Sequence, residues 1–333
     1  MMGWGYQYFN TIQDAVDAVL PGGTVQVARG RYDEHVIILK TLNLIGEDKY
    51  TTIIDGSGKG GIIQISYAAS ADNVLITGFT IQNGSTVSAR AGIEISYESN
   101  HIIITDNIIA TNYWGIELND AHECTISKNI ITVNNNLGIY LHFYSTNNNI
   151  FGNTIAGNRW GIDLDRSGNN KIFSNTFISN TEYGIYTYQS SNNLIYHNNF
   201  ITNTPNAYDA NSNTWDNGYP SGGNYWNDFD DPSDGAYDNN SDGIVDSAYN
   251  ISGKTPPNQD RYPLINPWEP SCGDCNGDGV IDVGDVVYLL NYLFKNGPAP
   301  QPLSLGDVNA DTMVDVGDVV FLLNYLFRNG PAP

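Results

Sequence analysis

The chain has 333 residues, with 36 acidic and 14 basic side chains and a formal net charge of −22. Such an acidic surface repels phosphate backbones, which argues against nucleic acid as a partner. No apolar run reaches the roughly 18 residues of a membrane span, and three cysteines are too few for a disulfide scaffold.

The N-terminal segment predicts a short amphipathic helix. The first ten residues, MMGWGYQYFN, lack the basic stretch and apolar core of a signal peptide. The stretch 10–20, NTIQDAVDAVL, then offers Thr11 as an N-cap and apolar residues at helical spacing. We expect this helix to cover the first turn of a repetitive structure, since open sheet edges would otherwise recruit other chains.

Five segments between residues 91 and 191 repeat with a fixed period. Apolar residues alternate between closely spaced turn residues, which is strand periodicity. Each repeat fits one turn of three short strands, stacked about 4.8 Å from the next turn. The sequence therefore predicts an all-β right-handed parallel β-helix, with asparagines forming ladders at the turns. The repeat glycines lie 23 residues apart, at Gly92, Gly115, Gly138, Gly161 and Gly184.

The start of the repetitive region resembles known families. The stretch 23–58, which opens with GTVQVARGRYDEHVIILK, resembles the first turns of pectin methylesterases and NosD-like proteins. The repeats resemble the parallel β-helix repeat class, and the resemblance covers residues 10–210. It implies the fold and leaves the function open, because lyases, hydrolases, epimerases and non-enzymes share this architecture.

The NosD resemblance also raises the question of copper, which prefers His, Met or Cys ligands. The methionines lie only at the start of the chain and at Met313, in a C-terminal loop whose oxygen-rich sequence predicts calcium binding. We therefore expect no copper site. The five histidines are scattered along the sequence, at His35, His101, His122, His142 and His197.

Carboxylates and aromatic side chains recur on the outward face of the repeats. Asp163 and Asp165 are two residues apart on one strand, about 6.6 Å, and inverting glycosidases separate their carboxyl groups by roughly 6.5–9.5 Å. Sugar rings stack on aromatic faces, so we predict a polysaccharide-contacting face. Its catalytic candidates are Asp163, Asp165, Arg166 and His142, and its substrate-binding candidates are Glu117, Tyr140, Trp114, Trp160 and Tyr186.

Two other interpretations of this face stay open. In the first, uronic acids undergo β-elimination or epimerisation, with acids or calcium neutralising the sugar carboxylate and Arg166, His142 or Tyr140 as the base. In the second, the β-helix is a non-catalytic structural or surface protein. Outward strand positions are polar in any such protein, and Asp163 with Arg166 would then be a surface ion pair worth under about 1 kcal/mol.

Residues 211–270 break the repeat and are rich in Asp, Asn, Gly, Tyr and Trp. The stretch GGNYWNDF resembles the segment that closes NosD-like β-helices, which predicts a C-terminal cap and linker here. Within it, DNNSDGIVD places oxygen side chains at calcium-loop positions 1, 3, 5 and 9, without an acid at position 12. A third calcium site and a solvated loop are both open for Asp238, Asn240, Asp242 and Asp246.

Residues 271–333 contain two copies of a loop followed by an apolar helix, which match at 20 of 27 positions. Each loop has oxygen side chains at positions 1, 3, 5, 9 and 12 and supplies a backbone carbonyl at position 7, as calcium requires. The predicted ligands are Asp274, Asn276, Asp278, Val280, Asp282 and Asp285 in the first loop and Asp307, Asn309, Asp311, Met313, Asp315 and Asp318 in the second.

This duplicated unit resembles a type I dockerin, because the first helix of an EF-hand is missing and position 12 is Asp. The resemblance implies two calcium ions, calcium-dependent binding to a cohesin module, and a secreted or surface-attached protein. The Val-Gly pairs that follow position 9 in both copies predict a duplicated recognition face, usable in either of two orientations. A purely structural calcium domain is the alternative.

Two details of this unit carry separate expectations. Thr312 occupies loop position 6, where a positive φ favours glycine, so we expect weaker calcium binding in the second loop. Cys272 and Cys275 either form a local disulfide or remain free thiols. The predicted organisation is a β-helix with its N-terminal cap over 1–210, a cap and linker over 211–270, and a dockerin over 271–333.

Overall fold

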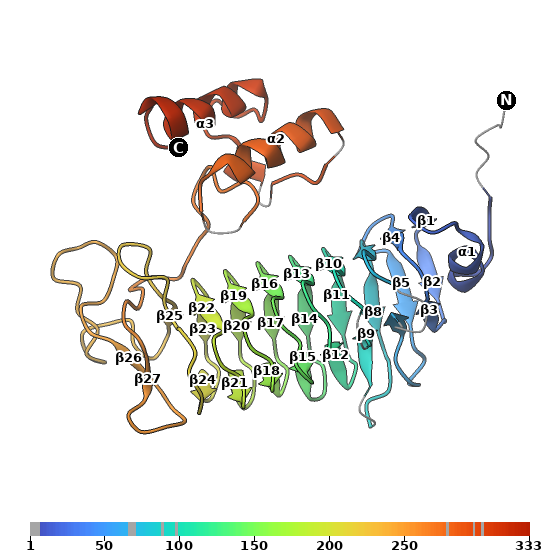
Figure 1. The fold of residues 1–333 in the computed structure, drawn as a ribbon, viewed down its shortest axis with the longest axis horizontal. Helices are drawn as coiled ribbons and strands as arrows, with labels where there is room; N and C mark the ends of the chain where they lie inside the picture. Colours follow the sequence, from blue (N-terminus) through green and yellow to red (C-terminus); the bar gives the residue numbers. More distant parts are fainter. Residues whose placement is uncertain are drawn as a thin grey trace. The chain divides into compact units, whose positions relative to one another are not determined.

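The computed structural model describes residues 7–65, 71–87, 90–96, 99–277, 280–295, 297–300 and 303–333. The chain divides into two compact units, Met1–Asn266 and Pro267–Pro333. The first unit is a parallel β-helix whose strands form three parallel sheets (Figure 1). The predicted β-helix is therefore confirmed.

Successive turns of the coil contribute one strand to each sheet. The first sheet contains β1 (Gly23–Val27), β4 (Leu42–Gly46), β7 (Leu75–Thr77), β10 (Ile103–Thr105), β13 (Thr125–Ser127), β16 (Asn149–Phe151), β19 (Lys171–Phe173) and β22 (Leu194–Tyr196). The second contains β2 (Gly30–Tyr32), β5 (Thr52–Asp55), β8 (Thr80–Gln82), β11 (Ile108–Ala110), β14 (Ile130–Thr132), β17 (Thr154–Ala156), β20 (Thr176–Ile178), β23 (Asn199–Ile201) and β25 (Tyr225–Trp226). The third contains β3 (Val36–Ile38), β6 (Ile63–Ile65), β9 (Ala91–Ile95), β12 (Trp114–Asn119), β15 (Leu137–His142), β18 (Trp160–Asp165), β21 (Tyr183–Tyr188) and β24 (Ala207–Asp209).

The repeat builds the core through exact register in the third sheet. Its strands place one isoleucine of each turn opposite the next, and all of these side chains are fully buried. Each such side chain contributes about 1.5–3 kcal/mol when it leaves water. The stack consists of Ile93, Ile116, Ile139, Ile162 and Ile185.

The repeat glycines are required by close contact between turns. A Cβ at Gly115 would lie 2.4 Å from the carbonyl oxygen of Gly138, and one at Gly161 would lie 2.4 Å from that of Gly184. A side chain at these positions would push adjacent turns apart. This contact explains why glycine returns every 23 residues.

Three asparagine ladders run along the coil, as the sequence predicts for its turns. In each, the Oδ1 atom of one asparagine accepts hydrogen bonds from the side chain of the asparagine one turn earlier, at 2.8–3.2 Å. The last step of one ladder is local, since Asn203 donates to Asn206 three residues further on, at 3.3 Å. All three ladders end on an aspartate, namely Asp260, Asp228 and Asp209. A carboxylate only accepts hydrogen bonds, so it can end a ladder that has no further asparagine.

Both ends of the coil are covered. Helix α1 (Ile12–Ala18) buries Ile12 and Val16, and Thr11 caps it by accepting a hydrogen bond from Asp14 N, as predicted. At the other end, Phe200 stacks on Trp226 at 4.3 Å and Trp226 on Tyr249 at 4.2 Å. The antiparallel pair β26 (Tyr249–Ile251) and β27 (Asn258–Asp260) belongs to this closing segment.

The second unit contains two helices, α2 (Val283–Lys295) and α3 (Val316–Arg328), and a short 3₁₀ helix, η2 (Leu303–Gly306). Each α-helix follows one of the two predicted loops. Val286 and Leu289 of α2 and Val319 and Leu322 of α3 form the core, together with Cys275. All three cysteines of the chain are free thiols, which answers the question about Cys272 and Cys275.

Candidate functional site

The outward face of the third sheet brings the predicted residues into one column. Register pairs place Glu117 opposite Tyr140, Tyr140 opposite Asp163 and Asp163 opposite Tyr186. The column includes Glu94, at the outward position of the first repeat, and continues beyond the repeats to Gln64 at one end and to Tyr208 at the other. Strict alternation on β6 and β24 was the signal for these additions, although no repeat glycine marks those strands.

Asp163 is the most unusual member of this column. Its side chain lies in register between Tyr140 and Tyr186 and is only 8% exposed. Its buried Oδ1 atom has no hydrogen-bond partner among the described residues. Burial, and secondly the charge of Asp165, raises the pKa of Asp163 to about 7. Asp163 can therefore hold a proton near neutral pH.

Asp165 lies in a different environment. The Nε and Nη2 atoms of Arg166 donate hydrogen bonds to its two carboxylate oxygens, both at 3.0 Å. The hydroxyl of Tyr140 donates a third hydrogen bond to Asp165, at 3.5 Å. The guanidinium group also lies 4.9 Å from the ring centre of Phe143. Arg166 thus forms its ion pair with Asp165, and not with Asp163 as the structural interpretation of the sequence had it.

Glu117 and His142 form a pair that the sequence did not predict. The Nε2 atom of His142 lies 2.8 Å from Oε1 of Glu117, on the neighbouring strand. Both side chains are largely buried, with exposed fractions of 8% for His142 and 14% for Glu117. The imidazole also stacks on the ring of Tyr140, with centroids 4.2 Å apart. Glu117 therefore orients His142, since a hydrogen bond to one ring nitrogen fixes the tautomer.

The predicted aromatic residues lie beside the carboxylates. Trp114 contacts Tyr140 at 5.0 Å between ring centres, and Trp160 contacts Tyr186 at 4.6 Å. Tyr186 in turn stacks on Tyr208 at 4.9 Å. Burial raises the pKa of Tyr140 and of Tyr186, with the nearby carboxylates acting in the same direction. Both hydroxyls therefore stay protonated over the physiological range.

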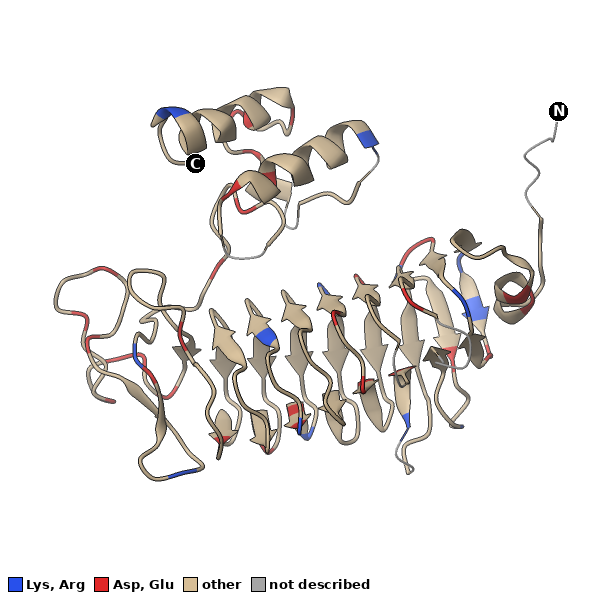
Figure 2. Cartoon of the chain, in the orientation of Figure 1, with Lys and Arg blue, Asp and Glu red and all other residues tan. Residues whose placement is uncertain are grey.

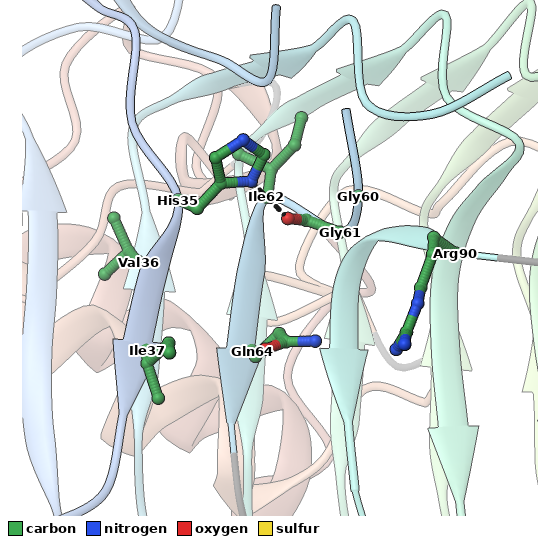
Figure 3. Close-up of a pocket in the computed structure, with 8 residues that line it drawn as sticks. All are labelled: His35, Val36, Ile37, Gly60, Gly61, Ile62, Gln64 and Arg90. Carbon is green, nitrogen blue, oxygen red and sulfur yellow. Dashed lines mark hydrogen bonds between the residues drawn. The ribbon is translucent and has the colours of Figure 1, made fainter. Parts of the chain in front are cut away.

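A pocket of about 260 Å³ lies at the N-terminal end of the same sheet, between β3 and β6 (Figure 3). Gln64 donates a hydrogen bond to the buried carboxylate of Glu94 at 2.6 Å, and Arg90 donates another at 3.3 Å. The Nδ1 atom of His35 lies 2.6 Å from the carbonyl oxygen of Gly61. The pocket walls combine polar and aliphatic side chains, and Gln64 joins them to the outward column. The lining residues are His35, Val36, Ile37, Gly60, Gly61, Ile62, Gln64 and Arg90.

In the second unit, the carboxylate at loop position 12 organises each calcium loop. In the first loop, Asp285 accepts hydrogen bonds from the backbone N–H groups of Asn276 and Asp282, at 3.1 and 2.9 Å. Asp318 does the same in the second loop with Asn309 and Asp315, at 3.2 and 2.7 Å. Acidic residues gather at the start of both helices (Figure 2).

The remaining predicted ligands belong to the same two loops. Asp278 lies outside the described residues. Thr312 has a φ of 75°, so the second loop does place a β-branched residue in the left-handed region, as predicted. The other members, Asp274, Val280, Asp307, Asp311 and Met313, occupy the loop segments before α2 and α3.

The loop 238–246 repeats the hydrogen-bond pattern of the second calcium loop. Asp238 accepts from the N–H groups of Asp242 and Gly243, and Asn240 accepts from that of Asp242. Asp307 accepts in the same way from Asp311 and Thr312, and Asn309 accepts from Asp311. The fourth candidate, Asp246, instead accepts from the backbone and side chain of Asn239.

The geometry thus defines a parallel β-helix protein with a polar-aromatic outward face and a duplicated calcium-loop unit. Residues 27–231, more than half of the chain, match the family described as "Periplasmic copper-binding protein (NosD)". Residues 272–327 match the dockerin type I domain. The chain therefore belongs to the NosD family of β-helix proteins and carries a C-terminal type I dockerin.

The solved structures that match this chain share little sequence with it. A Geobacillus virus E2 protein, ORF18, has 15% identity and a TM-score of 0.44, over 61% of this chain and 53% of that one. A periplasmic alginate epimerase has 19% identity and a TM-score of 0.40, over 57% and 46%. A mannuronan C-5 epimerase module of Azotobacter vinelandii has 17% identity and a TM-score of 0.38, over 59% and 74%.

The chain spans about half the length of the first two of these structures. No curated protein matches it. Among the described residues, no helix is both long and apolar enough to cross a membrane.

The described residues do not fit copper. Each histidine contacts a different partner, such as Gly61 for His35 and Glu117 for His142. The cluster of potential ligands found in the described part of the chain, Asp230, Asp231 and Asp234, contains carboxylates alone. Copper prefers imidazole and sulfur ligands, which this cluster lacks.

The dockerin loops do fit a hard cation. Dockerin type I domains bind calcium, which takes oxygen ligands from carboxylates and backbone carbonyls. Asp274, Asp285 and Asp318 are almost completely buried at these loops. Carboxylates are rarely buried unless they are paired or bind a metal, so their burial agrees with calcium.

Proposed function

We propose that this protein is an extracellular polysaccharide-binding and polysaccharide-processing β-helix, attached to a scaffold or surface through its dockerin. The observation that carries the proposal is Asp163, a buried carboxyl with an unpartnered oxygen beside the ion-paired Asp165. Two neighbouring carboxyl groups in such different environments are the usual arrangement for acid–base chemistry on a sugar.

The residues of the face take distinct roles. Asp163, protonated near neutral pH, donates its proton to the oxygen of a glycosidic bond. Arg166 and Tyr140 hold the charged carboxylate of Asp165, which stabilises the positive charge that develops on the sugar ring. His142, oriented by Glu117, is the candidate base that takes a proton from the water molecule that attacks the anomeric carbon as the glycosidic bond breaks. Trp114, Trp160 and Tyr186 provide aromatic faces for neighbouring sugars.

The test is a screen of neutral and acidic polysaccharides with wild type and Asp163→Asn. New reducing ends that depend on Asp163 support a hydrolase, and an unsaturated product absorbing in the ultraviolet indicates a lyase. Binding without product assigns the face to carbohydrate recognition alone. A result with no binding and no product would contradict the proposal. It would favour the structural alternative, in which the dockerin only fixes the coil in an assembly.

For the dockerin we propose calcium-dependent binding to a cohesin module through matching stripes on both helices. Val287 and Val320 are half exposed, at 49% and 50%, and Phe294 and Phe327 are both 65% exposed. Closely matching exposed fractions at positions 33 residues apart support two equivalent recognition faces. The stripes consist of Val283, Val287, Leu290 and Phe294 on α2, and of Val316, Val320, Leu323 and Phe327 on α3.

Glutamate substitutions test the two faces. We expect Val287→Glu and Val320→Glu singly to keep cohesin binding, because the other face remains, and the double variant to lose it. Leu303→Glu, on an equally exposed residue of η2, is the matched control. Failure of the calcium-loaded wild type to bind any cohesin module would contradict the docking proposal.

We propose two calcium ions in the dockerin and test a third in the loop 238–246. Calorimetric titration of the full chain gives the number of ions, and Asp238→Ala with Asp242→Ala removes one if the third loop binds. An unchanged count assigns that loop to solvent. Thr312→Gly should strengthen the weaker dockerin site, because glycine relieves strain of about 1 kcal/mol at a positive φ.

A further inference from the structure

The outward face of the third sheet is longer than the acid–base cluster at its centre. The column from Gln64 on β6 to Tyr208 on β24 crosses seven strands in unbroken register. Six steps of about 4.8 Å give it a length of about 29 Å. This direction is parallel to the coil axis (Figure 1). The rung spacing is close to the length of one sugar in an extended polysaccharide.

The two ends of the column differ in chemistry. At the C-terminal end, Tyr183, Tyr186 and Tyr208 lie within 4.9–6.0 Å of one another, beside Trp160. At the N-terminal end lies the pocket lined by Gln64 and Arg90 (Figure 3), and both of these side chains donate hydrogen bonds to Glu94. One end therefore offers stacking surfaces, and the other offers hydrogen-bonding groups and a cavity.

The charge of this face disfavours an anionic ligand. The arginines beside it are each paired with a carboxylate: Arg90 with Glu94, Arg159 with Glu182 and Arg166 with Asp165. Asp163 and Glu117 add carboxyl groups that face no arginine in these pairs. A uronic acid polymer would add negative charge to a face where these arginines are already paired with carboxylates. The added repulsion costs free energy in a partly buried site.

We propose that the ligand of this face is a single strand of neutral polysaccharide, lying along the coil axis from the pocket at Gln64 to Tyr208. This inference rests on the proposed polysaccharide function and adds the class and direction of the ligand. About six or seven sugars fit, one for each strand. Asp163 lies four strands from the Gln64 end and two from the Tyr208 end, so the strand extends further on the pocket side.

The test measures binding of the full chain to oligosaccharides of increasing length by calorimetry. One series is neutral, such as β-linked glucan and xylan oligomers, and a second series consists of uronic acids of matched lengths. Tyr208→Ala probes the far end of the face. Tyr237→Ala, which removes an exposed tyrosine from the closing segment, is the matched control.

We expect the affinity for neutral oligomers to rise with length up to about six or seven sugars. Tyr208→Ala should weaken binding of the longest oligomers by about fivefold to tenfold, the worth of one stacking contact, and leave binding of disaccharides unchanged. The control should bind like wild type. Uronic acid oligomers should bind more weakly at every length, with the difference shrinking as salt is added.

Three results would overturn the inference. Equal or tighter binding of uronic acids without calcium would refute the neutral ligand. A plateau of affinity at two or three sugars, or full affinity of Tyr208→Ala for long oligomers, would refute the axial arrangement. These results leave the proposed polysaccharide function intact, whereas the absence of binding to any oligomer would refute that function itself.

Discussion

Two buried aspartates, one in the outward face and one in the closing segment, share a raised pKa of about 7 and differ in almost every contact. Asp260 accepts hydrogen bonds from the backbone of Asn224 and Tyr262, at 2.7 and 3.1 Å, and from the indole of Trp226, at 2.9 Å. Asp163 leaves a buried oxygen without a partner among the described residues. Burial is the main cause of both pKa shifts.

The comparison teaches that the pKa alone does not separate a structural carboxyl group from a functional one. A buried acceptor with several donors stabilises the fold, while an unsatisfied one costs about 1–3 kcal/mol. Asp260 ends an asparagine ladder, so its donors are supplied by the coil itself. The buried oxygen of Asp163 lacks such donors among the described residues. The hydrogen-bond account identifies Asp163 as the candidate for function.

The largest expected effect is on activity. Asp163→Asn should lower the rate on the substrate found by the polysaccharide screen by about 10²–10⁴-fold, the usual contribution of a general acid. Asp260→Asn should keep the wild-type rate per folded molecule, because Asp260 lies outside the face. Initial rates, corrected for the folded fraction by circular dichroism, make the comparison. Equal losses of reaction rate in both variants would contradict the assignment of Asp163 to function and of Asp260 to structure.

The second effect is the pH dependence of stability. The folded pKa of Asp163, about 7, exceeds its unfolded value of about 3.9. The folded state therefore binds the proton more tightly, and this group's contribution to stability falls as the pH rises from about 4 to about 7. The Asp163→Asn variant lacks this pH-dependent loss of stability. Its free energy of unfolding at pH 8 should therefore exceed that of wild type, by at most about 4 kcal/mol.

Urea unfolding at several pH values measures this difference between wild type and Asp163→Asn. The difference in free energy of unfolding between the two proteins should change steadily from pH 4 to pH 7 and stay constant above pH 7. A variant that is less stable than wild type at pH 8 would show that the Asp163 carboxylate is satisfied in the fold, contrary to the structure.

The third effect is the stability of the ladder end. The pKa of Asp260 is raised as well, so both variants remove the cost of an ionised buried carboxyl group at pH 8. Asp260→Asn also places an amide N–H₂ group among donors that need an acceptor, so we expect it to be about 1–3 kcal/mol less stable at pH 8 than Asp163→Asn. Urea unfolding of the two aspartate variants side by side measures this difference. Equal stabilities would mean that the ladder does not depend on its terminal carboxylate.

The smallest effect concerns the neighbour of Asp163. Asp165→Asn removes the second cause of the raised pKa of Asp163 and releases Arg166. The midpoint of the pH-dependent stability should therefore move to lower pH by less than about one unit, because burial remains the larger cause. A shift to higher pH would contradict this ordering of causes.

The period of the sequence predicted what the repeat itself builds. The isoleucine stack, the glycine contacts and the outward column from Glu94 to Tyr186 follow from a spacing of 23 residues, because a constant spacing between the strands of the third sheet fixes their register. The N-cap at Thr11 and the positive φ of Thr312 followed from local backbone chemistry. Ranking Asp163 as a candidate also needed only the alternation of side chains.

Contacts that leave the columns could not be predicted in this way. Glu117 contacts His142 diagonally, from one strand to the adjacent strand, and Arg166 contacts the preceding residue, Asp165. The rotamers of long side chains decide such contacts, and the strand register does not. The aspartates that end the ladders lie in or beside the closing segment, which has no repeat. The spacing of the sequence therefore does not predict them. The path of the backbone there decides which carboxylate reaches which asparagine.

The most direct test of the central claim is a crystal structure of Asp163→Asn with a neutral oligosaccharide of about seven sugars. Our account predicts sugar density along the outward face of the third sheet, between Gln64 and Tyr208, with a glycosidic oxygen within hydrogen-bond distance of the side chain at position 163. Sugar bound to the first or second sheet, or to the closing segment, would contradict the account.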